Sequence, residues 1–180
     1  MMKTLSLSVA VALAGTTLTA AAQTPPAPPP PAAKAQATPY VMAAGKSDLY
    51  EIESSRIAMQ KSRTPAVRNF ADMLIKHHQK TTAATMVAAR RAGMKPTPPT
   101  LGPGAAASIA ELRAAGAADF DRVYLAQQLP AHQAALELHQ SYGARGDQAA
   151  LRTSAKAAVP IVRSHLTAAE RLQANPRNGM

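Results

Sequence analysis

Cysteine is absent from the 180-residue sequence, and its absence excludes several kinds of site at once. Disulfides, iron–sulfur clusters, thiolate nucleophiles and cysteine-ligated zinc all require it. Tryptophan is absent too, and aromatic residues make up only 3% of the chain, so stacking platforms for nucleic-acid bases are scarce. We therefore expect no nucleic-acid partner, and a fold that is stabilised by hydrophobic packing alone.

Acidic residues are also few. The chain has 10 Asp and Glu against 20 Lys and Arg, a formal net charge of +10. A basic protein attracts anions, and an anionic surface of the cell envelope is the partner that this charge favours. The basic residues are spread along the chain, with only Arg90 and Arg91 as a tight pair. A solvated basic surface without a partner is the alternative interpretation.

Common catalytic motifs are missing as well. The sequence has no Gly-x-Ser-x-Gly turn, no P-loop and no dinucleotide-binding glycine pattern. Its few carboxylates form no clear pair of the kind that hydrolyses glycosides. These absences favour a protein that is not an enzyme.

Long hydrophobic runs are confined to the beginning of the chain. Residues 1–22 are typical of a secretory signal peptide, with Lys3, a mostly apolar stretch over 5–18 and small residues at 20–22. An uncleaved membrane anchor is the alternative, but the stretch is shorter than the roughly 20 residues that a spanning helix needs. We expect cleavage before Gln23, a periplasmic or secreted protein, and no transmembrane segment afterwards.

The remaining chain divides by composition into three parts. Residues 23–39 are rich in Pro and Ala, which predicts an extended, disordered tether that serves as a spacer or is a passive leader. Residues 40–174 carry the helical pattern and form the predicted domain. Residues 175–180 are a predicted disordered tail that begins with Asn-Pro.

Hydrophobic periodicity predicts four long helices in the domain. They cover residues 41–61, 65–92, 117–142 and 148–173, and an alanine-rich helical stretch from about 105 with a break at Gly116 precedes the third. Short links join the first helix to the second and the third to the fourth, which predicts two antiparallel hairpins. The predicted fold is therefore all-α, a four-helix bundle.

Three residues mark the predicted helix ends. Thr64 precedes a proline and is a suitable N-cap for the second helix, and Gly93 is a suitable glycine at its C-terminal end. Asp147, after a turn at 143–146, is the predicted N-cap of the fourth helix.

Three histidines on the apolar stripes of three helices are the main functional signal. His78, His132 and His165 face the predicted core, where an unsatisfied polar group is costly. They could satisfy one another through a shared metal ion, with Glu51 of the first helix as a fourth ligand. Such a ligand set suits iron, zinc or copper. The alternative is three separate core histidines, each hydrogen-bonded to its own partner.

Other positions near these histidines carry weaker expectations. Glu53, and Asp48 one turn before Glu51, are further carboxylates of the first helix. His77 is predicted to lie at the core boundary, and His139 near a helix end to be exposed. Counting from the turn at 143–146 places the fourth-helix histidine roughly 10 Å along the axis from that of the third helix.

Prolines at 130 and 160 lie within the third and fourth predicted helices, close before their histidines. Each is expected to kink its helix, because proline removes a backbone hydrogen bond and crowds the preceding turn. The kinks either make room around the histidine rings or are tolerated irregularities of packing.

Five segments resemble the domain of unknown function 4142 family: YEIESSRIA at 50–58, VRNFADMLIKHH at 67–78, FDRVYL at 120–125, AHQ at 131–133 and VPIVRSHL at 159–166. The resemblance covers about residues 41–172. It implies a ferritin-like four-helix fold and export from the cytoplasm. Members of the family are often described as predicted outer membrane proteins, so the resemblance also implies an association with the outer membrane. It implies no established activity.

The resemblance also implies which polar positions recur in the family, namely Glu51, His78, His132 and His165. One position departs from the family pattern. His77 stands where the family usually has an aspartate, so a carboxylate that could bind a metal or orient a ligand is missing there.

Overall fold

The computed structural model describes residues 28–175, and this part of the chain is helical without any strand. Its elements are η1 (Pro31–Lys34), α1 (Ala37–Lys61), α2 (Pro65–Arg91), α3 (Pro103–Ala114), α4 (Phe120–Arg145) and α5 (Ala149–Ala174). The all-α prediction is confirmed. The predicted signal peptide and nearly all of the predicted tail lie outside the described residues.

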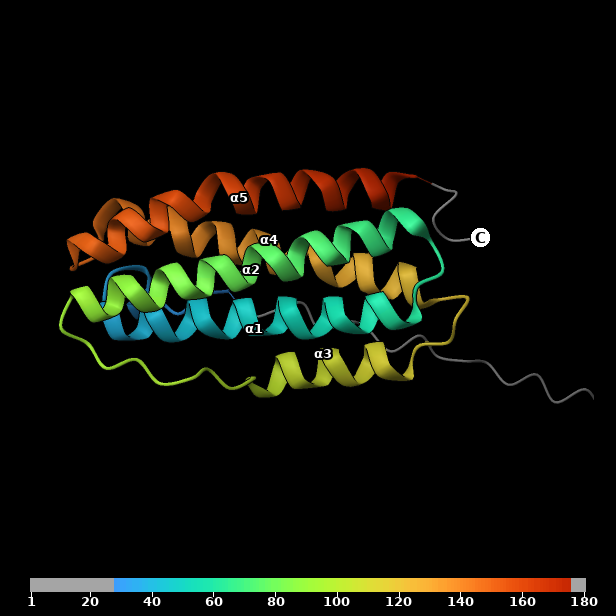
Figure 1. Ribbon diagram of the computed structural model, residues 1–180, viewed down its shortest axis with the longest axis horizontal. Coiled ribbons are helices and arrows are strands. Elements are labelled where there is room, and N and C mark those ends of the chain that lie inside the picture. Colours follow the sequence, from blue (N-terminus) through green and yellow to red (C-terminus); the bar gives the residue numbers. More distant parts are fainter. Residues whose placement is uncertain (1–27, 176–180) are drawn as a thin grey trace, which may run out of the picture.

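The four long helices surround one interior (Figure 1). α1 packs against α2 and α4 packs against α5, while α2 also contacts α5 and α1 contacts α4. The connection after α2 runs back along the bundle and includes α3, which packs against α1 (Figure 1). As a result α2 and α4 run in the same direction. Among residues 28–175, no helix has the length and hydrophobicity needed to cross a membrane.

The interior changes from apolar to polar and back along the bundle axis. At one end Phe70, Leu74 and Tyr124 belong to one hydrophobic cluster, and at the other end Tyr40 and Tyr142 belong to a second. On each long helix the buried polar residues lie mainly between these clusters, and they include Asp48, Glu51, His78, His132 and His165. The predicted core-facing stripes of α2 and α5 are buried as expected. The polar layer is therefore enclosed by packed hydrophobic residues on both sides.

The predicted tether is wrong for its last residues. Pro31–Lys34 forms a 3-10 helix, and α1 begins at Ala37, before the predicted boundary at residue 40. The buried Ala33 and Ala37 pack with the hydrophobic cluster of Tyr40, and Ala35 accepts a hydrogen bond from the Asp147 amide at 3.0 Å. Small alanines between the prolines allow this close packing, which composition alone does not reveal.

The turn between α4 and α5 also lies later than predicted. α4 continues through Gly143 to Arg145, and the N-cap of α5 is Gln148 rather than Asp147. The Asp147 carboxylate instead accepts a hydrogen bond from the Tyr142 hydroxyl at 2.8 Å.

Other predicted helix ends are close to those of the structure. Gly93 follows α2 with a φ of 77°, as its predicted role requires. Thr64 is the N-cap of α2, but its side chain donates a hydrogen bond to Asp121 at 2.6 Å instead of capping the helix. α4 and α5 continue without a break through Pro130 and Pro160.

Candidate metal centre

His78, His132 and His165 converge in the polar layer of the bundle. Each offers one ring nitrogen, and these atoms all lie within 4.8 Å of one another. The ring centroids are 5.1 to 5.7 Å apart. The exposed fractions are 2%, 0% and 0%, so solvent does not satisfy the rings. The structure therefore places these three histidines in one buried group that could hold a metal ion.

The helix ends of the structure explain why His165 reaches His132. α4 ends at Arg145 and α5 begins at Ala149, so the turn is shorter and later than the sequence predicted. His132 lies 13 residues before the end of α4 and His165 lies 16 residues after the start of α5. The difference, 16 minus 13, is three residues, or about 4.5 Å along the axis. The predicted offset was therefore too large.

Two of the rings are held from their outer side by groups that can only accept. His78 donates from Nδ1 to the Asp48 carboxylate at 2.8 Å, and His132 donates from Nδ1 to the Gln128 carbonyl at 2.9 Å. A neutral imidazole carries one proton, so the Nε2 atom of each ring is left with a lone pair. Among the described residues neither Nε2 atom has a hydrogen-bond partner, although both are buried. Metal-binding histidines are typically oriented in this way.

The third ring has the same division between its two nitrogens. His165 Nε2 lies 2.8 Å from Nδ1 of His77, within hydrogen-bonding distance, while its Nδ1 is buried and has no partner in the described structure. His77 itself is half-buried, as predicted. His77, at the position where the resemblance to the family implies an aspartate, thus contacts the group of histidines.

Burial keeps two of the rings in the neutral form that binds metals. It lowers the pKa of His132 to about 3 and that of His165 to about 2, and the neighbouring His78 adds to both shifts. For His78, burial acts in the same direction, but the hydrogen bond and charge of Asp48 outweigh it and raise the pKa. A carboxylate in this place makes the imidazole a more basic ligand.

Asp48 is the main polar anchor of the group. Its buried carboxylate accepts hydrogen bonds from His78 at 2.8 Å, from Thr81 at 3.0 Å and from Thr82 at 2.8 Å. The sequence indicated Asp48 only as a neighbouring carboxylate. Its spacing of three residues from Glu51 places both on one face of α1, which could have identified it as a partner of His78.

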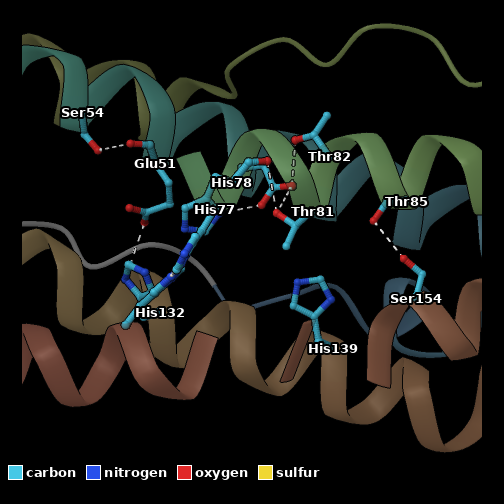
Figure 2. A network of polar contacts seen from close by, with 12 residues as sticks. Glu51, Ser54, His77, His78, Thr81, Thr82, Thr85, His132, His139 and Ser154 are labelled. Atoms are coloured by element: carbon cyan, nitrogen blue, oxygen red, sulfur yellow. Dashed lines mark hydrogen bonds and ion pairs between the residues drawn. The ribbon is translucent and has the colours of Figure 1, made fainter. Parts of the chain in front are cut away.

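Glu51 lies beside the three histidines but does not belong to the group of converging atoms. Its side chain is buried, and neither carboxylate oxygen has a hydrogen-bond partner among the described residues. Oε1 lies 3.8 Å from His132 Nδ1, too far for a hydrogen bond (Figure 2). Burial raises the pKa of Glu51 to about 7. Glu53, the other carboxylate, is partly exposed and pairs with Arg56.

Comparisons with known proteins show the family and the fold of this chain. The family DUF4142, described as a domain of unknown function, matches residues 21–172. The chain belongs to this family. No curated protein matches this DUF4142 chain. A solved structure titled "CopM in the Cu(II)-bound form" is similar to it, with a TM-score of 0.64 and 14% sequence identity, covering 77% of this chain and 95% of the other. At this identity the similarity shows the fold alone.

The expected exposure of His139 is wrong for this DUF4142 domain. His139 is 4% exposed, and its Nδ1 lies 3.0 Å from the Tyr40 hydroxyl, within hydrogen-bonding distance. Burial lowers its pKa to about 4. The side chain lies apart from the other rings in Figure 2. Its spacing of seven residues from His132, two helical turns on the same face, was the signal for burial.

Proposed function

We propose that this DUF4142 domain binds a transition-metal ion through His78, His132 and His165. One observation supports the proposal most strongly. The three histidines converge, and among the described residues one buried nitrogen of each ring has no hydrogen-bond partner, while the other nitrogen lies within hydrogen-bonding distance of a neighbouring group. Buried polar atoms without partners are costly, and a shared cation would satisfy all three together.

Neutral imidazoles suit copper, zinc and iron, and these are the candidate ions. The structure similar to this chain was solved with Cu(II), which makes copper the first ion to test. We include Glu51 as a fourth ligand in the proposal. Three neutral ligands leave the full charge of a divalent ion in a buried site, and a nearby carboxylate without partners would offset part of it.

We infer that the bundle is of the ferritin-like type and acts outside the cytoplasm. Two antiparallel hairpins joined by a long crossover are one of the arrangements found in ferritin-like bundles. The signal-like sequence of residues 1–22 supports export to the periplasm or beyond. The fold type does not transfer ferritin chemistry to this chain.

The test is metal binding by the chain from Gln23 onward, purified without chelator. Elemental analysis and calorimetric titration with Cu(II), Zn(II) and Fe(II) would be compared between the wild type and the double variant His78→Ala/His132→Ala. The control is His139→Gln, which changes a buried histidine outside the group. We expect about one ion per chain in the wild type and the control, and none in the double variant.

Failure to take up any of the three ions would contradict the proposal. The histidines would then be structural, and the alternative from the sequence would apply, a non-enzymatic envelope protein whose basic surface binds anions. Salt-sensitive binding to vesicles of anionic phospholipid, absent with neutral phospholipid, is the measurement that would support this alternative.

A further inference from the structure

His77 and His165 are in contact through two ring nitrogens, and either nitrogen could carry the proton of the hydrogen bond. The two rings are stacked, with centroids 5.1 Å apart and an angle of 19° between their planes. They join α2 to α5 through the contact between His77 Nδ1 and His165 Nε2 at 2.8 Å. His77 is half-buried, whereas His165 is fully enclosed. The pair therefore lies at the edge of the buried group (Figure 2 labels His77).

The requirements of metal binding decide where the protons must lie. His165 can bind an ion through Nδ1, its buried nitrogen without a partner, only if that nitrogen carries no proton. The single proton of the neutral ring must then be on Nε2. The atom next to Nε2 is Nδ1 of His77, so His77 has to accept this hydrogen bond and carry its own proton on Nε2.

We propose that His77 is a positioning residue that accepts a hydrogen bond from His165 Nε2 and thereby keeps His165 Nδ1 free to bind a metal ion. The part of this inference that concerns metal binding rests on the proposed function, but the tautomer of His165 can be measured whether or not metal is bound. His77 itself is not a ligand, because its contacting nitrogen faces His165 and not the converging atoms. Its role for His165 corresponds to that of Asp48 for His78.

Two variants separate the hydrogen bond from mere packing. His77→Asn retains an acceptor oxygen close to the place of Nδ1, while His77→Leu has a similar size and no acceptor. In the leucine variant the Nε2 proton loses its acceptor, so the balance between the two tautomers of His165 should shift toward a proton on Nδ1. Circular dichroism would show that both variants fold.

The first measurement is the nitrogen-15 NMR spectrum of the histidine rings in the metal-free protein. We expect the Nε2–H tautomer of His165 in the wild type and in His77→Asn, and a shift toward the Nδ1–H tautomer in His77→Leu. A wild-type His165 with its proton on Nδ1, or a leucine variant with an unchanged tautomer, would overturn the proposal.

The second measurement is the affinity for Zn(II), whose closed shell keeps the NMR signals sharp. Loss of an orienting group typically weakens metal binding about 10- to 100-fold. We expect this loss in His77→Leu and a change within about threefold in His77→Asn. Equal loss in both variants would contradict the hydrogen-bond role. The expected tautomers together with no metal uptake by the wild type would instead refute the proposed function and leave the role of His77 toward His165 established.

Discussion

At the scale of single residues, the site depends on which nitrogen of each ring is already engaged. Asp48 and the Gln128 carbonyl are acceptors only, so they fix the neutral rings of His78 and His132 in the tautomer whose Nε2 carries no proton. Sequence reasoning found the three histidines because each lies on an apolar stripe of its helix. It did not identify the orienting contacts, because Asp48 was indicated only as a neighbouring carboxylate and the Gln128 carbonyl belongs to the backbone.

Replacing Asp48 by Asn tests this orientation. The amide keeps an oxygen near His78 Nδ1 but removes the negative charge that raises the basicity of the ring, so we expect metal affinity to fall about 10-fold. Titration calorimetry with Cu(II) or Zn(II) measures the change. Asp72→Asn is the matched control, since Asp72 is exposed and pairs only with Lys76. Equal affinities of Asp48→Asn and the control would contradict the role of Asp48.

The pKa shifts predict how stability depends on pH in the metal-free protein. In the folded protein the pKa values of His132, His139 and His165 are about 3, 4 and 2, below the unfolded value of 6.5. The stability that each of these histidines contributes is therefore lost as the pH falls below 6.5. Glu51 has a raised pKa of about 7 against 4.5, so its contribution is lost as the pH rises from 4.5 to 7. Between pH 5 and 6 the unfolded state binds more protons, and stability rises with pH.

Urea unfolding at pH 5 and pH 6 checks this sign. From these four groups, three protons gained and one lost on unfolding give a slope of about 2.7 kcal/mol per pH unit, and the lowered pKa of His77 adds to it in the same direction. Glu51→Gln removes the opposing contribution and should make the slope steeper by up to about 1.4 kcal/mol per unit. Stability that falls between pH 5 and 6 would show that the carboxyl, and not the histidines, dominates.

At the scale of elements, the apolar periodicity of α2 and α5 was sufficient to predict which faces are buried. The ends of the elements were less predictable. Beyond the end of α4, Asp147 accepts a hydrogen bond from the Tyr142 hydroxyl, and near the start of α1, Ala33 and Ala37 pack in the hydrophobic cluster of Tyr40. The later end of α4 reduces the axial offset between His132 and His165 to about 4.5 Å.

The end of α2 offers a test at this scale. Gly93 has a φ of 77°, and a Cβ added there would meet no other atom within 4 Å, so Gly93→Ala should cost about 1 kcal/mol from backbone strain alone. Gly104→Ala, in the first turn of α3 and equally open, is the control and should be neutral or slightly stabilising. Chemical denaturation gives both values. Equal effects would show that the left-handed conformation carries no cost.

At the scale of the whole molecule, the site joins elements that are distant in the sequence. His78 comes from α2, His132 from α4 and His165 from α5, while α1 supplies Asp48 and Glu51. Hydrophobic clusters on both sides of this layer hold the helices together without metal. A bound ion would therefore add a link among three helices and stabilise the folded state by mass action.

The expected gain follows from the affinity. At a free metal concentration 100 times Kd, the free energy of unfolding should rise by about 2.7 kcal/mol. Thermal unfolding of the wild type with and without Zn(II), compared with His165→Gln, measures it. Each protein is also scanned with chelator, where the gain should vanish. A gain of the same size in the variant would indicate that metal stabilises the protein from another place.

The helical class, the buried faces and the three histidines could all be predicted from the amino-acid sequence, because periodicity and residue type are local properties of the chain. Three further features depend on the folded molecule: that the rings meet, which nitrogen of each remains without a partner, and that Glu51 lies beside the group rather than within it. The physical reason is that convergence depends on helix ends, and orientation on hydrogen bonds. The packing that brings the rings together joins residues far apart in the sequence, and the orienting hydrogen bonds include both the local contact of His132 with Gln128 and the contact of His78 with Asp48, 30 positions away.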